Sequence, residues 1–359
     1  RWTTPDRWPH RKMWLWDSVF HAQGLRRLDP AVARETLEAV FDGQCADGFI
    51  PHMASPHEKS DITQPPILGY GIKLMLEQQQ SPEFLERLYP KNAAFLNWIF
   101  AHRDTDGAGL VEWAIEAHEM CRSGESGMDN STRFDGATQL DAPDFNAYLA
   151  SECEIMAEFA ALLGRPEEQK LWQERHRKLN HLMNERLWND AAGLYVDYDL
   201  AAGKQSPVLS LAGFLPLISG APTAEMAEKL VRNLKNPETF GTPFPVPSIS
   251  FSQPEFYSKD MWRGPVWINI NTLIARGLDR YGYRDEARQL RSRTMRELEK
   301  FYCRYGTFFE FYDDRNECDP PELLRKFRCD PDRSVYHQAF MDYGWSATLY
   351  IDLAFTMYS

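Results

Sequence analysis

The chain has 359 residues, of which 43% are hydrophobic and 26% are charged. This balance excludes a disordered chain and is typical of a globular protein with a large core. The formal net charge of −12 argues against nucleic acid and anionic membranes as partners, and no apolar run reaches membrane-spanning length.

Hydrophobic periodicity predicts a succession of helices. In segment 144–163, for example, apolar residues recur at helical spacing, Asp144 can cap the start, and Gly164 and Pro166 mark the end. The segments predicted as helical are 15–27, 31–43, 68–79, 82–103, 144–163, 166–187, 207–218, 223–234, 265–281, 284–302 and 338–357.

Short apolar segments that follow a glycine turn recur between these helices, at 47–50, 107–111, 193–196 and 306–309. They predict short strands or hairpins in the connections. Helix pairs with such loops suggest a closed barrel of helical hairpins, with the loops gathered around a pocket at one end. Because no linker or low-complexity tract divides the chain, we expect one domain covering residues 1–359.

The six cysteines show no C-x-x-C spacing, so the sequence predicts neither a zinc site nor a redox motif. Because the chain begins at Arg1 rather than at Met, it says nothing about a signal segment. A cytoplasmic location is the favoured expectation, and the sequence leaves the oligomeric state open.

The segment 124–133 is too polar and too rich in glycine for a helix interior. Its small residues let the backbone approach a ligand, and Glu125 and Asp129 provide two carboxylates. Hydrolysis of a glycosidic bond needs a protonated carboxyl near the leaving oxygen. Taken alone, however, such a segment is more often a surface loop.

A second candidate is Glu310, which lies between aromatic residues in segment 308–312. A carboxylate in such surroundings is costly unless it is paired or functional. Partial desolvation would raise its basicity, which suits a catalytic base. The alternative is an edge strand whose Glu side chain points to solvent.

Trp262, Arg263 and Trp267 are predicted at the mouth of a helix that Pro265 can begin. An Arg can fork onto a carboxylate or sugar hydroxyls, and a Trp can stack on a sugar ring. The alternative is a buried Arg that braces the fold.

Near the start of the chain, Trp14, Asp17 and His21 can share one helical face. A lone His in this position is more often a core residue than a ligand. The turn at 63–66 contains two prolines and would fix the amide of Gln64. Aromatic residues make up 13% of the chain, which suits sugar stacking but equally suits a large helical core.

The segment Asp104-Thr105-Asp106-Gly107 faintly resembles a calcium loop, but Ile115 stands at the twelfth loop position, where a Glu is required. A turn between helices is the preferred interpretation.

Taken together and in order, these segments resemble the clan of inverting α-glycosidases that includes glycoside hydrolase family 63 and the family 37 trehalases. The matching motifs are W-D-S at 16–18, S/T-Q-P-P at 63–66, E-S-G-x-D-x-S-x-R at 125–133, D-L-N at 144–146 with Phe for Leu, W-R-G-P-x-W-x-N at 262–269, E-x-Y at 310–312 and G-W-S/T at 344–346. The motif at 262–269 points to family 63 or the mannosylglycerate-hydrolase-like proteins rather than to trehalases.

The resemblance implies an all-α fold, an (α/α)6 barrel of six hairpins with short β-hairpins in the active-site loops. It implies hydrolysis of an α-linked glucoside or mannoside of a small saccharide with inversion, with Asp129 as general acid, Glu310 as general base, and neither cofactor nor metal. The residues expected to shape the sugar subsite are Trp14, Trp16, Asp17, His21, Gln64, Glu125, Asn130, Arg133, Asn146, Trp262, Arg263, Trp267 and Trp345.

The segment 312–321 departs from the family, whose members often follow E-x-Y with an Asn/Asp-Pro and a Thr-Gly turn. Because this loop would border the leaving group, the sequence leaves the identity of the leaving group open. Two other functions stay open. One is a sugar epimerase or isomerase, which would use His21 and His52 as acid and base, and the other is an inactive sugar-binding protein.

Overall fold

The computed structural model describes residues 1–116, 118, 121–326 and 338–358. Within these ranges the chain is mainly helical. The α-helices are α1 (Leu15–Leu25), α2 (Pro30–Asp42), α3 (Leu68–Gln78), α4 (Pro82–His102), α5 (Pro143–Leu162), α6 (Pro166–Leu182), α7 (Pro216–Ser219), α8 (Ala224–Lys235), α9 (Ile268–Arg280), α10 (Arg284–Tyr305) and α11 (Gly344–Tyr358).

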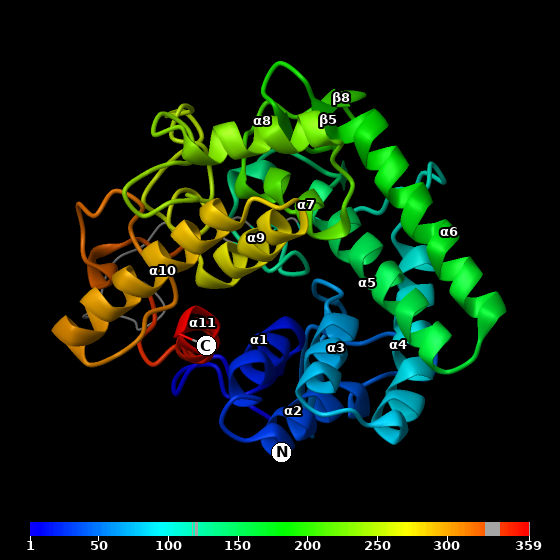
Figure 1. Ribbon diagram of the computed structural model, residues 1–359. Helices are drawn as coiled ribbons and strands as arrows, with labels where there is room; N and C mark the ends of the chain where they lie inside the picture. Colours follow the sequence, from blue (N-terminus) through cyan, green and yellow to red (C-terminus); the bar gives the residue numbers. More distant parts are fainter. Residues whose placement is uncertain (117, 119–120, 327–337, 359) are drawn as a thin grey trace.

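The odd-numbered helices form a closed inner ring. Each of α1, α3, α5, α7, α9 and α11 packs against the next, and α11 packs against α1 to close the circle. Figure 1 shows this ring, with α2, α4, α6, α8 and α10 around its outside. The chain therefore alternates between inner and outer helices.

Burial follows from this arrangement. In α1 every residue except Leu25 is buried, because an inner helix touches neighbours on all sides. The outer helix α8 instead buries only one stripe, Ala227, Leu230, Val231 and Leu234, at helical spacing. Burial on all sides thus marks the inner helix α1, and a single buried stripe marks the outer helix α8.

Short strands lie in the connections that lead from an outer helix to the next inner helix. The strands are β1 (Met13–Trp14), β2 (Met53–Ser55), β3 (Glu58–Lys59), β4 (Leu140–Asp141), β5 (Trp188–Asn189), β6 (Leu194–Tyr195), β7 (Tyr198–Asp199) and β8 (Lys204–Gln205). They pair in antiparallel fashion in the orders β1-β2-β3, β4-β7-β8 and β5-β6. These connections are long enough to build a pocket at the ends of the inner helices.

Most predicted helices are confirmed, and the differences have local causes. Segment 207–218 forms a 3-10 helix (Leu211–Phe214) and the single turn of α7, because Pro216 interrupts it and Gly213 packs directly on Leu194 and on the Tyr195 carbonyl. The last helix begins at Gly344 rather than at residue 338, and Asp144 lies inside α5 rather than at its cap.

Among the predicted strands, only 193–196 contains one, β6. The segments 47–50, 107–111 and 306–309 are turns, in which Gly48, Gly107, Gly109 and Gly306 have positive φ angles. None of the helices in the described ranges is long and apolar enough to cross a lipid bilayer.

Candidate active site

Many of the predicted site residues meet in one cavity, of about 70 Å³. They come from the start of α1, the start of α11 and the connections that precede α3, α5, α9 and α11. The predicted residues that line the cavity are Trp14, Trp16, Asp17, Gln64, Asp129, Trp262, Trp267, Glu310 and Trp345.

The loop that carries Asp129 packs closely against the cavity wall. Gly127 has a φ of 71°, and a Cβ there would lie 2.4 Å from Cζ2 of Trp16. Only glycine fits this backbone conformation and this contact. The carbonyl oxygen of Asp129 accepts a hydrogen bond of 2.8 Å from the Arg122 N–H. The loop is therefore held so that the Asp129 carboxyl faces the cavity.

Glu310 follows α10, and both its backbone and its side chain are held by hydrogen bonds. Its N–H donates to the Phe340 carbonyl at 2.9 Å. Its carboxylate accepts from Arg325, with Nε at 2.9 Å and Nη2 at 3.2 Å. The side chains of Arg325 and Glu310 are only 6% and 2% exposed, so this is a buried, forked ion pair.

Asp129 has a different cationic partner, Lys326, which follows Arg325 in the sequence. Lys326 Nζ lies 2.7 Å from Asp129 Oδ2, and the two side chains are 24% and 21% exposed. Burial raises the pKa of Asp129, but the Lys326 ammonium, with Arg325 and His52, lowers it by more, so the net pKa is below its ordinary value. Asp129 is thus held as a carboxylate.

Tryptophan rings form much of the cavity wall. Trp262 stacks on Trp267 with ring centroids 3.7 Å apart and planes 2° apart. Trp345 contacts Trp16 edge to face at 5.3 Å. The Trp267 indole N–H donates to the Met261 carbonyl at 2.9 Å, which fixes the stacked pair. Such rigid aromatic faces suit the apolar faces of a sugar ring.

Two polar residues complete the part of the wall near α1. The Gln64 side-chain oxygen accepts from the Trp16 N–H at 3.1 Å, so the predicted turn at 63–66 fixes this amide. Asp17 is buried, and burial raises the pKa of its carboxyl well above its ordinary value, with further increases from Glu310, Asp6 and Asp129.

Three predicted residues lie outside the cavity and hold its loops. Glu125 is fully buried and accepts from Arg103 and from the N–H groups of Thr63 and Ala114. Asn146 binds the Val111 backbone on both sides, and Asn130 accepts from the Trp262 N–H at 3.1 Å. Their hydrogen-bonding groups are turned to backbone and to other side chains, so they brace the site.

Arg133, Arg263 and His21 also lie outside the cavity. Arg133 is forked between Asp144 and Asp197, with all three side chains buried. Arg263 donates to Asp135 at 2.7 Å on the outer side of its loop. His21 is buried beneath the site, where its Nδ1 is 2.6 Å from the Thr3 hydroxyl oxygen, and burial lowers its pKa to about 3.

The family model for the mannosylglycerate hydrolase MGH1-like glycoside hydrolase domain matches residues 10–346. The chain belongs to this family. Its members are glycosidases, and the prediction of a family 63 type rather than a trehalase is confirmed.

Two relatives illustrate the range of the family. The mannosylglycerate hydrolase of Rubrobacter radiotolerans is 27% identical, with 86% of each chain covered. The glucosylglycerate hydrolase of Mycolicibacterium hassiacum is 24% identical, with 86% of this chain and 87% of the relative covered.

The fold agrees with a solved relative as well. The crystal structure of the family 63 mannosylglycerate hydrolase from Thermus thermophilus, in complex with Tris and D-glycerate, superposes with a TM-score of 0.82 at 26% identity. The match covers 98% of this chain and 96% of that one. With the closed ring of inner helices, it confirms the predicted (α/α)6 barrel.

Several residues of this glycosidase's cavity were not predicted from the sequence. Arg325, His10 and Tyr343 line the cavity, and Lys326, which is not among the lining residues, pairs with the lining residue Asp129. His10 pairs with Asp6 and packs edge to face on Trp14. The only signal in the sequence was the adjacent Arg and Lys that follow the segment departing from the family pattern.

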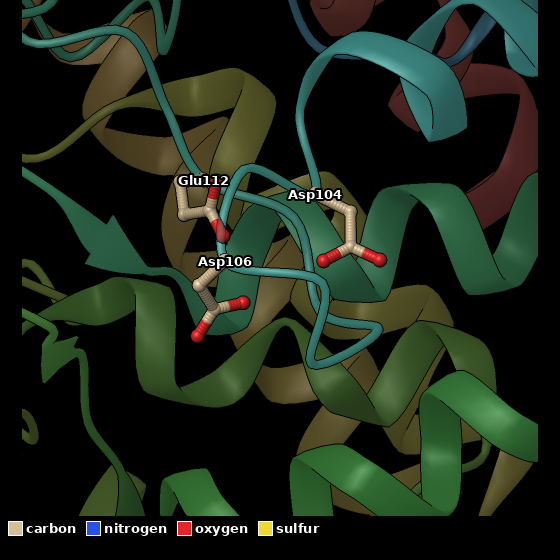
Figure 2. A group of neighbouring side chains, drawn as sticks. All are labelled: Asp104, Asp106 and Glu112. Atoms are coloured by element: carbon tan, nitrogen blue, oxygen red, sulfur yellow. The ribbon is translucent and has the colours of Figure 1, made fainter.

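A separate acidic cluster lies in the loop after α4, where Figure 2 shows Asp104, Asp106 and Glu112 together. One carboxylate oxygen from each lies within 4.8 Å of the others. Thr105 donates to Glu112 from its N–H and hydroxyl, and Gly109 N–H donates to Asp104. The comparison with a twelve-residue calcium loop missed Glu112, which stands at the ninth position. The absence of a metal stays a prediction at this cluster.

Proposed function

We propose that this chain hydrolyses an α-linked glucoside or mannoside with inversion of the anomeric carbon. Asp129 protonates the leaving oxygen, and Glu310 takes a proton from a water molecule that attacks the opposite face of the ring. The observation that carries this proposal is that Asp129 and Glu310, from loops far apart in sequence, line one cavity walled by tryptophan. Residues 1–359 then act as one catalytic domain without a cofactor.

For the substrate, we infer a hexose linked to a small hydroxy acid such as glycerate. Relatives across most of the chain are named for mannosylglycerate and glucosylglycerate. The contacts support the same class, because Arg325 in the cavity wall and Lys326 beside Asp129 bring two positive charges to this site in a chain of net charge −12. A carboxylate on the leaving group would meet these cations.

The positions of the histidines favour hydrolysis over epimerisation. His21 lies beneath the cavity, and His52 is hydrogen-bonded to the Ser60 hydroxyl. Among the described residues, His10 is the histidine that lines the cavity, and it is paired with Asp6. The described part of the chain therefore brings no pair of histidines to one substrate carbon. The presence of both Asp129 and Glu310 in the cavity wall argues against an inactive sugar-binding protein.

A substrate panel tests the proposal. Purified protein is incubated with α-mannosylglycerate, α-glucosylglycerate and neutral α-glucosides, and the released sugar and glycerate are measured. We expect release from a glycosylglycerate and its loss in Glu310→Gln, because an amide cannot take the water's proton. Epimerised sugar, or binding without release, would contradict hydrolysis. Glu238→Gln, at an exposed position in the connection between α8 and α9, serves as a control that should keep full activity.

A further inference from the structure

The ion pair between Lys326 and Asp129 is at odds with the role of a general acid. An acid must carry a proton when the glycosidic bond breaks. With an ammonium 2.7 Å away, Asp129 carries none. Lys326 must therefore leave Asp129 before the reaction.

The position of Lys326 is built into the fold. Its backbone has a φ of 55°, and its N–H donates to Asp260 Oδ1 at 2.9 Å. The same oxygen accepts from the Asn130 side chain at 2.8 Å, next to Asp129. Asp260 is buried, so it ties the acid loop and the loop of Lys326 to one fixed point. The contact between Lys326 and Asp129 follows from this anchor.

The two cation pairs of the cavity differ in how readily they exchange partners. Arg325 forks onto Glu310 and is buried with it, whereas Lys326 makes a single contact in a part-exposed position. A part-exposed single contact contributes little free energy and is easily replaced by another anion. Arg325 can therefore stay in place while the Lys326 side chain moves.

We propose that Lys326 is a substrate-operated switch, which holds Asp129 as a carboxylate in the empty site and transfers to the carboxylate of the leaving group when substrate binds. Asp129, whose side chain is 21% exposed, then takes up one proton from solvent once it has lost its cation, and becomes the general acid. This inference rests on the proposed function. In glycerate, each hydroxyl is within two carbons of the carboxylate. A lysine beside the general acid Asp129 can therefore reach the carboxylate of a glycerate leaving group.

The charges of the cavity support proton uptake. Arg325 and Lys326 balance Glu310 and Asp129, so a bound monoanion adds one uncompensated negative charge, which protonation of Asp129 removes. Among the other groups around Asp129, Asp17 and Glu116 are acidic, and Arg325 and His52 lower the pKa of Asp129 less than Lys326 does. The groups that act on Asp129 from the elements around it are Lys326, Arg325, His52, Asp17, Glu116 and Cys121.

The first test compares two substrates in Lys326→Met. For the glycosylglycerate that the wild type cleaves, we expect kcat/KM to fall by about 10- to 100-fold, the loss of one charge-assisted contact. For the matching neutral glycosylglycerol, kcat should be kept or should rise, because Asp129 is no longer held ionised. For this neutral substrate, the alkaline limb of the plot of kcat/KM against pH should move to higher pH in Lys326→Met. Lys326→Arg should restore the preference for the anionic substrate.

A matched control separates the switch from a structural role. Lys259 pairs with Asp313 and Glu317 in the neighbouring loop, outside the cavity. Lys259→Met should change both substrates alike and leave the alkaline limb in place. Equal losses on both substrates in Lys326→Met, or an unmoved alkaline limb, would overturn the switch while leaving hydrolysis intact.

The second test does not depend on turnover. D-Glycerate binding is measured by calorimetry at about pH 6 in two buffers of different ionisation enthalpy, which gives about one proton taken up per wild-type site and none in Lys326→Met. Binding without uptake in the wild type would overturn the switch. Uptake without hydrolysis of any glycoside would support the switch and sink the proposed function.

Discussion

Two groups of ion-paired side chains in this molecule lie in different surroundings. In one, Arg133 lies between Asp144 and Asp197, and the three side chains are at most 1% exposed. In the other, Arg325 and Lys326 meet Glu310 and Asp129, and the outer pair is about a fifth exposed. The first group joins the loop before α5 to the connection after α6, whereas Glu310, Asp129 and Arg325 of the second group line the cavity.

The difference lies in the number of contacts and in access to water. Arg133 donates to both carboxylates through paired hydrogen bonds of 2.6–2.9 Å, so no other anion can compete for it. Lys326 makes a single part-exposed contact with Asp129, which lines the cavity, so a substrate carboxylate can replace Asp129 as its partner. Burial and forked geometry fix a charge in the fold, whereas a single accessible contact leaves it available for catalysis.

The largest expected effect is on the acid itself. Asp129→Asn keeps the shape of the side chain but removes the proton donor, so turnover of a substrate with a poor leaving group should fall roughly 10²–10⁴-fold or more. A substrate with a good leaving group needs less protonation and should lose much less. Steady-state kinetics on both substrates provides the measurement. Near-normal turnover of the poor leaving group would show that Asp129 is not the acid.

Substitution of Arg133, the cation of the fully buried group, should lower the stability of the fold rather than change the pH dependence of activity. Arg133→Met leaves Asp144 and Asp197 buried without their cation, and we expect the free energy of unfolding to fall by roughly 3–5 kcal/mol. Lys326→Met should change it by less than about 1 kcal/mol, because its ion pair is part-exposed. Urea unfolding of the two variants measures both values. Equal losses would remove the distinction between the two groups.

Glu152 offers a third case, a buried carboxyl with neutral partners. It accepts from the N–H groups of Gly69 and Tyr70 and from Asn92, and burial raises its pKa to about 7. Because the folded pKa lies above the unfolded one, its contribution to stability is full at low pH and is lost as pH rises toward 7.

Glu152→Gln mimics the protonated acid and should lack this loss. Relative to wild type, the variant should gain about 1–3 kcal/mol of unfolding free energy between about pH 5 and about pH 8. Urea unfolding across this range gives the difference at each pH. A difference that does not change with pH would mean that Glu152 titrates normally in the fold.

Much of the fold could be predicted because helix periodicity is a local property. The stripes and caps of segments 15–27 and 284–302 lie within the segments themselves, and α1 and α10 form there. Among the described residues no strand pairs with the apolar segments 107–111 and 306–309, so they stay turns. Pairing partners are set by the barrel and cannot be read from one segment.

Only those residues of the candidate site that belong to sequence motifs could be predicted. Motifs found Asp129, Glu310 and the tryptophans, and they also included Asn146 and Glu125, which hold loops instead of lining the cavity. Residue type and spacing do not separate a side chain that faces a ligand from one that supports it. Lys326 was missed because it reaches Asp129 only through the fold.

The most direct test of the central claim is the anomer that forms first. If Glu310 activates water on the face opposite the leaving group, an α-linked substrate must first give the β-sugar. Proton NMR of the anomeric signals in the first minutes, before mutarotation, measures this. We expect the β-anomer to appear first in the wild type. An initial α-anomer, or a glycosyl ester trapped on Glu310, would contradict this account of Asp129 and Glu310.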